Sequence, residues 1–356
     1  MTPPLDLAAW GGSTVTTITG ALSMKSIAIF NNKGGVGKTT LLANLASYLA
    51  LEKERRVLIV DADPQCNATQ LMFADSEVDK LYSDKETFTI DKIIHPLATG
   101  KGYAKTISPI SRPEYGLEIL IGDPQLSLRE DLLARDWSQS IGGDTRGLRT
   151  SYVFAELLTR CADYDYVFFD VGPSLGAINR SVLLGCDFFV SPMSIDIFSL
   201  RAIENIRVSI EKWRKQLSTA LAQLDDPESL PAEVDTALSI KFLGYVTQQY
   251  IAKTSGQGER QAVAAYERIM KKVWPTIRAN FVRHLQPEQS DFDYFLGTIP
   301  NLYSLILMSQ FARRPIFALR AKDGVRGAHF NKVREAEELF RTIADRLEEN
   351  LGQFGD

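Results

Sequence analysis

Short apolar runs alternate with longer stretches of helical spacing along most of the chain. The runs lie at residues 25–30, 57–60, 117–121, 164–170, 186–190, 242–247 and 295–300. Each run has the length of a buried strand, and a stretch such as residues 41–50 has the length and composition of a helix. Strands that alternate with helices predict a mainly parallel, twisted sheet with helices on both faces. We therefore expect an α/β fold with three layers.

The chain has 356 residues, and we expect residues 24–356 to form a single domain. Residues 13–19 are mostly small and polar, and residues 1–23 lack the regions of a secretion signal, so residues 1–23 are predicted to form a disordered tail. Residues 75–115 and 251–294 have the character of insertions into the alternating pattern.

The second insertion contains one periodic segment. Residues 260–274 predict a helix, and Pro275 is expected to end it. Four side chains with helical spacing form its core-like face, namely Val263, Tyr266, Ile269 and Met270. We expect this helix to pack on the domain.

The composition argues against several classes of protein. No run of about eighteen apolar residues occurs, so no transmembrane helix is expected. The three cysteines and three histidines are scattered without disulfide or metal-ligand spacing, which favours a reducing cytoplasm and no iron–sulfur or zinc centre. Residues 334–351 predict a final helix rich in Glu, which anionic membranes would repel.

The most informative motif follows the first predicted strand. Residues 33–40 read Lys-Gly-Gly-Val-Gly-Lys-Thr-Thr. Glycines let backbone N–H groups turn toward phosphates, and the N-terminus of the next helix attracts the same anion. In such a P-loop, Lys38 reaches the β- and γ-phosphates and the Thr39 hydroxyl holds Mg²⁺. The predicted nucleotide contacts are Lys33, Gly34, Gly35, Val36, Gly37, Lys38, Thr39 and Thr40.

The entrance of this loop departs from the usual pattern. Asn32 stands where the motif ordinarily has its first glycine, and a second lysine, Lys33, follows it. Taken alone, Lys33 fits a solvated loop lysine as well as a phosphate contact.

Carboxylates end two other predicted strands. Asp61 and Asp63 follow the run at 57–60 and point to the same side, because they are two positions apart in extended chain. Asp170 ends the run at 164–170, as in a Walker B strand that holds Mg²⁺ through water. The carboxyl ends of parallel strands share one edge, so we expect these groups beside the phosphates. Helix capping is the alternative for the first pair.

Together these motifs resemble the ParA/MinD family of ATPases, and within it the ParA and Soj partition proteins. The similar segments are the deviant P-loop at 31–40, switch I at 61–69, switch II at 171–176 and a Gly-Thr-Ile-Pro segment within 295–300. Cys66 and Gly172 stand where the family pattern has glycine and proline.

The resemblance implies a role for each matched residue. Lys33 would reach across an ATP-sandwiched dimer to the partner's phosphates, and Lys38 would act within its own subunit. Asp63 would orient the attacking water, which makes these three the expected catalytic residues, and Asp61 would support the Mg²⁺ shell. The expected adenine contacts are Thr247, Gln248 and Pro300.

The resemblance also implies ATP and Mg²⁺ as cofactors, a homodimer, and slow ATP hydrolysis stimulated by a ParB-like or other adaptor protein. It further implies nonspecific binding of double-stranded DNA in a cytoplasmic, nucleoid-associated protein. The net charge of −4 opposes nucleic-acid binding, but positive charge concentrates between residues 313 and 334 and again in the insertion between residues 253 and 283. The expected DNA contacts are Arg313, Arg314, Arg320, Lys322, Arg326 and Lys332.

Three other functions stay open at this point. The chain could bind nucleotide as an interaction protein that hardly hydrolyses it. It could be a ParA-like ATPase for cargo positioning or defence that binds a protein partner without DNA. It could be a metabolic P-loop enzyme that phosphorylates or ligates a small molecule.

Overall fold

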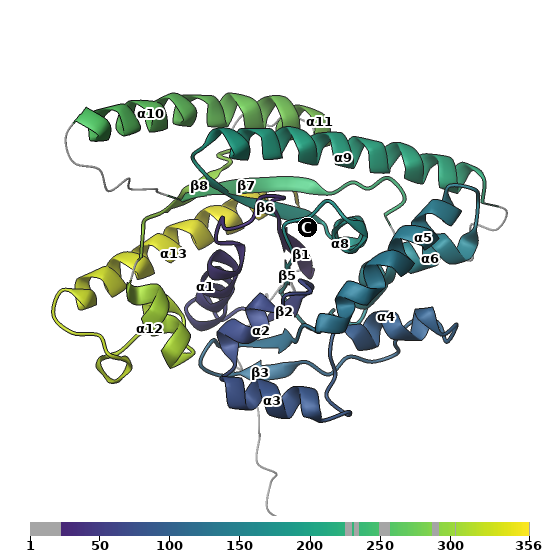
Figure 1. Cartoon of the computed structure of the whole chain (residues 1–356), viewed down its shortest axis with the longest axis horizontal. Coiled ribbons are helices and arrows are strands. Elements are labelled where there is room, and N and C mark those ends of the chain that lie inside the picture. Colours follow the sequence, from purple (N-terminus) through teal and green to yellow (C-terminus); the bar gives the residue numbers. More distant parts are fainter. Residues whose placement is uncertain are drawn as a thin grey trace, which may run out of the picture.

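A single sheet runs through the domain (Figure 1). The computed structural model describes residues 23–224, 230, 235–248, 257–286, 292–302 and 304–355. The eight strands lie in the order β3-β4-β2-β5-β1-β6-β7-β8, and only the pairing of β3 with β4 is antiparallel. Their bounds are β1 Lys25–Ile29, β2 Val57–Asp61, β3 Ile110–Arg112, β4 Leu117–Leu120, β5 Tyr166–Asp170, β6 Phe188–Ser194, β7 Lys241–Gln248 and β8 Phe295–Ile299.

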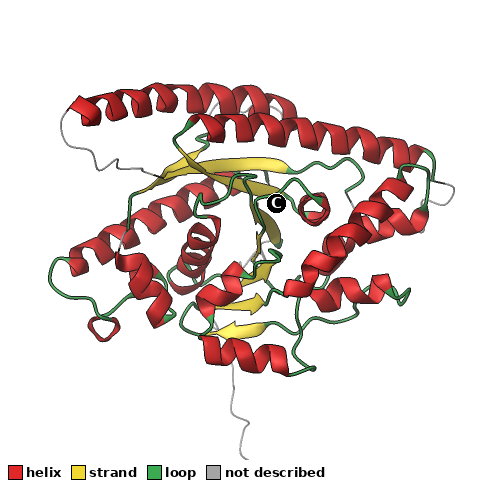
Figure 2. Cartoon of the chain, in the orientation of Figure 1, coloured by secondary structure: helices red, strands yellow, loops and turns green. Residues whose placement is uncertain are grey.

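Helices cover both faces of this sheet (Figures 1 and 2). One face packs against α1 (Lys38–Leu51), α2 (Asn67–Met72), α12 (Ser304–Ala312) and α13 (His329–Gly352). The other packs against α4 (Asp91–Ala98), α5 (Glu130–Ser140), α6 (Thr145–Ser151), α7 (Val153–Leu158), α8 (Ala177–Gly185), α9 (Ile197–Ala222) and α10 (Gln257–Ile277). Ile27 and Ala28 belong to opposite cores, because side chains alternate along a strand. The predicted three-layer α/β fold is confirmed.

The three central strands bring the predicted motifs together. β1 and β2 both pair in parallel with β5, and Asp61 lies opposite Asp170 in the register. β1 pairs with the opposite edge of β5, and there Ile29, the last residue of β1, lies opposite Asp170. The loops that follow these strands therefore leave the same edge of the sheet.

The segment from 75 to 115 contains more structure than its polar sequence suggests. It forms α3 (Asp75–Ser83), α4 and the edge strand β3. Ile93, Ile94 and Leu97 of α4 are buried in the core, so only one face of this short helix carries the apolar signal. Because α4 is eight residues long, its periodicity is too brief to stand out from the surrounding polar residues.

The predicted end of the helix at Pro275 is wrong. α10 continues through Pro275 to Ile277, and a π-turn (Arg278–Val282) and α11 (Arg283–Leu285) follow it. A proline removes one backbone donor, and here the packing of the helix outweighs that loss. Tyr266, Ile269 and Met270 pack against the core, as predicted, whereas the side chain of Val263 lies outside the described residues.

The tail predicted for residues 1–23 falls almost wholly outside the part of the chain that the structure describes. Among the described helices, none combines the length and the apolar character that crossing a bilayer requires.

Candidate functional site

The glycine-rich loop is built to approach an anion closely. Gly35 and Gly37 have positive φ angles of 71° and 69°, a conformation that glycine adopts without strain. A Cβ atom on Gly37 would lie 1.8 Å from Nε2 of Gln248, so a larger residue would be strained by the positive φ and would also displace the Gln248 amide. α1 begins directly after Gly37, and no side chain caps its first N–H groups. These donors are therefore available to a phosphate.

Lys38 lies in this loop with its ammonium group largely buried. Its Nζ donates to the carbonyl oxygens of Asn31 and Lys33, at 3.3 Å in each case. Burial lowers the pKa of Lys38, although the nearby Asp170 and Asp63 carboxylates oppose that effect. The loop thus holds a cation in place before any ligand binds.

Asp170 and Thr39 form a pair suited to a divalent cation. The Thr39 hydroxyl donates to Oδ2 of Asp170 at 2.8 Å. The other carboxylate oxygen, Oδ1, is buried and has no hydrogen-bond partner among the described residues. Burial and the neighbouring Asp61 raise the pKa of Asp170 well above its usual range. An unpartnered buried carboxylate oxygen beside a hydroxyl is the oxygen-rich environment that Mg²⁺ prefers, so these residues fit that ion.

The two switch I aspartates play different structural parts. Oδ2 of Asp61 accepts hydrogen bonds from the backbone N–H and the hydroxyl of Thr69, at 2.8 and 2.7 Å, and the residue is fully buried. Asp63 accepts from the Gln65 N–H at 3.0 Å and from the Asn67 side chain at 3.1 Å. Asp63 lines the open cavity beside the loop, whereas Asp61 anchors the start of α2 behind it.

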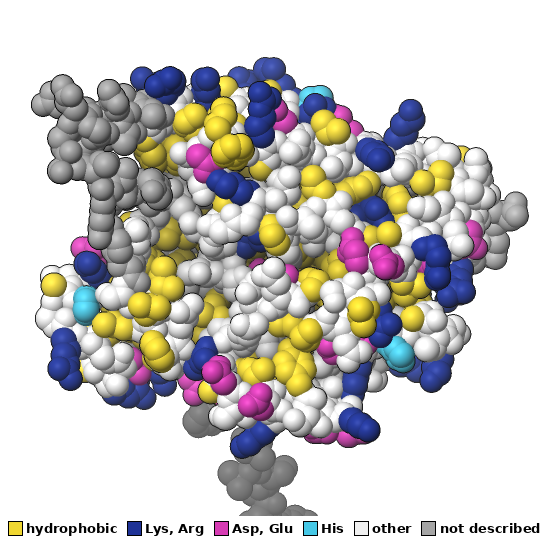
Figure 3. All heavy atoms as spheres, viewed as in Figure 1, with side chains coloured by type: hydrophobic (Ala, Val, Ile, Leu, Met, Phe, Trp, Pro, Cys, Tyr) yellow, Lys and Arg dark blue, Asp and Glu magenta, His cyan; other side chains and the backbone are white. Residues whose placement is uncertain are grey.

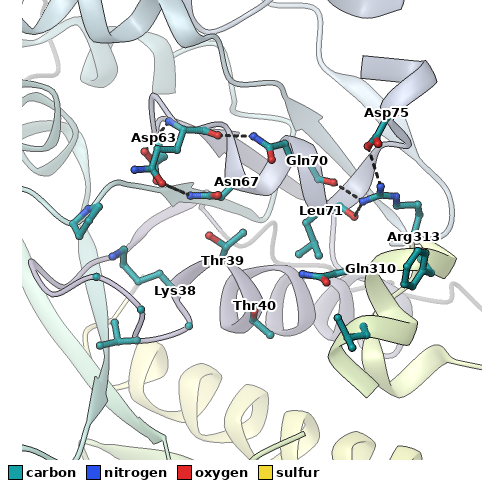
Figure 4. A pocket seen from close by; sticks show the side chains of 18 residues that line it. Lys38, Thr39, Thr40, Asp63, Asn67, Gln70, Leu71, Asp75, Gln310 and Arg313 are labelled. Carbon is teal, nitrogen blue, oxygen red and sulfur yellow. Dashed lines mark hydrogen bonds and ion pairs between the residues drawn. The ribbon is translucent and has the colours of Figure 1, made fainter. Parts of the chain in front are cut away.

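A cavity of about 730 Å³ opens over the glycine-rich loop (Figure 4). Its floor is the loop from Gly34 to Thr40, and switch I forms one wall. Pro173 closes a second side, and α12 contributes a third. Figure 4 shows Thr39 and Asp63 on one side and Gln310 and Arg313 on the other. The motifs did not identify Gln70, Leu71, Asp75, Leu307, Gln310 and Phe311 as lining residues.

Comparison with known proteins places these features in a family. A sequence profile of the AAA domain family matches residues 24–223, which is more than half of the chain. The sporulation initiation inhibitor protein Soj of Bacillus subtilis is 31% identical over 203 residues, which cover 55% of this chain and 69% of Soj. The chain belongs to the ParA/MinD family of ATPases. The chromosome partitioning protein ParA of Myxococcus xanthus is 30% identical over 55% of this chain and 61% of its own length.

The matched part spans 61–66% of the length of the first curated relatives. Two solved structures cover more of the chain. The crystal structure of a protein from Corynebacterium diphtheriae is 34% identical, with a TM-score of 0.61 over 82% of this chain and 97% of that one. A Borrelia burgdorferi protein described as a plasmid partition protein, solved with AMPPNP, is 19% identical with a TM-score of 0.53 over 89% and 98%. The second likeness shows the fold alone.

The extra lysine of the ParA/MinD loop has a partner within the same chain. Nζ of Lys33 forms an ion pair with Oδ2 of Asp196 and lies 3.5 Å from the Ser199 hydroxyl. Asp196 also caps α9, because its Oδ1 accepts the Ser199 N–H at 3.0 Å. The position of Lys33 at the loop entrance was predictable, but its partner was not.

Switch II is held at both ends by side chains that the motifs did not reveal. Asn179 donates to the carbonyl oxygens of Gly172 and Ser174, at 2.8 and 2.7 Å. The Glu130 carboxylate accepts the backbone N–H groups of Ala177 and Ile178 at the start of α8. Neither Asn179 nor Glu130 belongs to a recognised nucleotide-binding motif, so no signal in the sequence predicted these contacts.

The expected adenine contacts do not line the described cavity. The Thr247 hydroxyl is buried and lies 2.7 Å from the Thr298 hydroxyl on the neighbouring strand. The Gln248 amide packs over Gly37, and Pro300 is exposed at the end of β8. Their role toward a base stays a prediction.

The expected DNA contacts divide into two groups. Arg313 points inward and donates to the carbonyl oxygens of Gln70 and Leu71, at 2.5 and 3.3 Å. Arg314 is mostly buried, with Nε 4.0 Å from an Asp323 oxygen. The other four are exposed. Arg320, Lys322 and Arg326 lie between α12 and α13, and Lys332 lies in the first turn of α13.

Proposed function

We propose that this chain is an ATP-hydrolysing switch that closes as a dimer around ATP and Mg²⁺ and drives DNA segregation or cargo positioning. The observation that carries the proposal is that Lys38, Thr39 and Asp63 line one glycine-rich cradle, with Asp170 bonded to Thr39. Lys33 stands at the entrance of the same loop, where its backbone carbonyl accepts from Lys38. Membership of the ParA/MinD family supports it.

Each side chain has a distinct part in this mechanism. The loop N–H groups and Lys38 bind the phosphates, and their positive charge offsets the negative charge of the transition state. Thr39 and Asp170 hold Mg²⁺, which supplies further neutralisation of phosphate charge when bound. Asp63 faces the cavity and orients the water that attacks the γ-phosphate. Lys33 leaves Asp196 and reaches the phosphates bound by the second subunit.

Hydrolysis then acts as the release signal. Switch I and switch II border the cavity through Asp63 and Pro173, so the presence of a γ-phosphate biases both loops. We propose that the closed dimer binds double-stranded DNA without sequence preference and a ParB-like or other adaptor protein, which accelerates the slow reaction. Such a protein is expected in the cytoplasm, associated with the nucleoid.

A second function follows from the inward direction of Arg313 and Arg314. With those two arginines engaged, the surface expected to meet DNA is smaller than the sequence suggests. The alternative is therefore a ParA-like ATPase with a role outside segregation, in cargo positioning or defence, that binds a protein partner and no DNA.

The test combines hydrolysis and assembly. Phosphate release is measured for the wild type and for Lys38→Ala and Asp63→Ala, with DNA present, and the dimer is followed by size exclusion with an ATP analogue. We expect slow turnover in the wild type, loss of turnover in both variants, and a dimer that Lys33→Ala prevents. Equal inertness of all three proteins would refute the enzyme, and a monomer with bound ATP analogue would refute the shared site.

A further inference from the structure

Basic side chains gather along the outer side of α10 and the turn after it. Between residues 266 and 285 there are five Lys or Arg residues and one acidic residue, Glu267. The five are all exposed, namely Arg268, Lys271, Lys272, Arg278 and Arg283. Figure 3 shows a row of such side chains along the upper edge, where Figure 1 places α9, α10 and α11. The whole chain has a net charge of −4, so positive charge is segregated onto this edge.

The spacing makes these residues a continuous stripe. Arg268, Lys271 and Lys272 are at helical positions i, i+3 and i+4, which lie on one face. The opposite face is fixed in the core by Val273 and Ile277, which are 2% and 0% exposed. At a rise of about 1.5 Å per residue, the stripe from Arg268 to Arg283 is about 22 Å long.

Three charges of the stripe are available to an external partner. Arg268, Lys271 and Lys272 make no ion pair within the described residues. The neighbouring α9 adds Lys212 and Lys215, both exposed. The nearest acidic group on α9 is already engaged, because Glu211 contacts Arg207 and His284.

We propose that this stripe, formed by α10 and the adjoining side of α9, binds the phosphate backbone of double-stranded DNA without reading its sequence. Duplex DNA carries one negative charge per about 1.7 Å of helix axis, so a straight stripe of about 22 Å faces several phosphates at once. The inference deepens the proposed function by moving the main DNA surface from the segment between α12 and α13 to α10.

An anionic membrane is the less suitable partner for the same charges. A helix that lies on a membrane inserts its apolar face between the lipids. In α10 that face is Val273 and Ile277, together with Tyr266, Ile269 and Met270, and it packs on the domain. What the described part of α10 offers to the outside is mainly charge, which matches a phosphate backbone; its partly exposed Trp274 is stacked on Tyr294.

The test compares two matched double variants of the full chain. Lys271→Ala with Lys272→Ala removes two charges from the stripe, and Lys322→Ala with Arg326→Ala removes two from the segment between α12 and α13. Binding to a labelled 24-base-pair duplex is measured by fluorescence anisotropy from 50 to 200 mM salt, with ATP analogue and with ADP. Phosphate release without DNA is measured for all three proteins.

We expect the stripe variant to bind at least fivefold more weakly at 100 mM salt, while the other variant changes less than twofold. Because each neutralised phosphate contributes about 0.9 to the slope of log K against log salt, the slope should fall by about 1.8 in the stripe variant alone. Unstimulated hydrolysis should be equal in all three, which shows that the fold and the nucleotide site are intact.

Three results would overturn the inference. Equal weakening of both variants means that only net charge matters, and weakening confined to the Lys322 and Arg326 variant places DNA elsewhere. Wild-type protein that binds anionic phosphatidylglycerol vesicles and no duplex favours a membrane. Because hydrolysis is read separately, loss of DNA binding in an active ATPase refutes this surface without refuting the enzyme.

Discussion

Lys33 and Asp196 form an ion pair within one chain, although they lie 163 positions apart in the sequence. Their side chains are 27% and 35% exposed, so the pair is partly shielded from water. Burial alone would raise the pKa of Asp196, but the hydrogen bond from Lys33 prevails and lowers it. In the proposed dimer Lys33 must exchange this carboxylate for phosphate oxygens, so Asp196 competes with assembly.

Removing the charge of Asp196 should therefore favour the dimer. Asp196→Asn keeps a side-chain oxygen to cap α9, because asparagine caps helices as well as aspartate does. A partly exposed pair is worth about 0.5–1 kcal/mol, and each dimer releases two of them, so we expect half-assembly with ATP analogue at roughly a five- to thirtyfold lower protein concentration. Analytical ultracentrifugation measures this midpoint.

The control is the same substitution combined with Lys33→Ala, which should stay monomeric as Lys33→Ala alone does, because the gain from Asp196→Asn acts through Lys33. A midpoint that rises in Asp196→Asn would mean that the carboxylate prepares Lys33 for its partner instead of withholding it.

The contacts of Asn179 with switch II should matter for hydrolysis. Asn179→Ala leaves the carbonyl oxygens of Gly172 and Ser174 without this donor, which costs about 1–2 kcal/mol of stability and loosens the loop beside Asp63. Ser181→Ala is the matched control on the same helix, because its hydroxyl donates to the Ser151 carbonyl at 2.6 Å, outside the switch.

Urea unfolding and phosphate release together separate the two effects. We expect similar losses of stability in both variants and slower hydrolysis, by about fivefold or more, only in Asn179→Ala. Equal hydrolysis rates would show that Asn179 serves the fold alone. The rate change expected here corresponds to about 1 kcal/mol of activation free energy.

Cys66 adopts the left-handed conformation that its place in switch I requires. Its φ angle is 53°, and its side chain is 3% exposed. This conformation destabilises the folded state by about 1–2 kcal/mol for a non-glycine residue, and burial of the thiol stabilises it by a similar amount. We expect Cys66→Gly to lie within about 1 kcal/mol of the wild type in free energy of unfolding.

A β-branched side chain should fail at the same position. Cys66→Val is expected to lose more than about 2 kcal/mol, because valine is strongly disfavoured at positive φ. Urea denaturation of both variants provides the comparison. If valine is tolerated as well as glycine, the backbone at this position is not left-handed in solution.

Asp61 should make the stability of the nucleotide-free protein depend on pH. Burial, which hydrogen bonds from Thr69 only partly offset, raises the pKa of Asp61 to about 7. The folded chain then holds a proton that the unfolded chain releases above about pH 4. This contribution to stability is complete below about pH 4 and is lost as the pH rises to about 7.

Asp61→Asn removes that titration while keeping an acceptor for Thr69. Urea denaturation between pH 4 and 7 should therefore show a smaller decline in the free energy of unfolding for the variant than for the wild type. Parallel curves for the two proteins would show that Asp61 does not titrate in this range.

Residue patterns were sufficient for the fold class, the seven strand positions and the three motif carboxylates. Each of these depends on neighbours a few positions away, such as the alternation around Ile27 or the glycines before Lys38. Two features were not predicted. The helix α4 was missed because its three buried residues lie in a polar segment, and the continuation of α10 through Pro275 was missed because proline usually ends a helix.

Folding alone decided which side chains meet across long separations. Three contacts join segments that share no local sequence pattern. Lys33 pairs with Asp196, Glu130 accepts backbone N–H groups at the start of α8, and Arg313 donates to carbonyl oxygens of α2. The physical reason is that local spacing determines the conformation of a loop or helix, whereas the partner of a charged side chain depends on which elements the sheet order brings side by side. For that reason the position and conformation of the loop could be predicted from its residues, and the groups that restrain it could not.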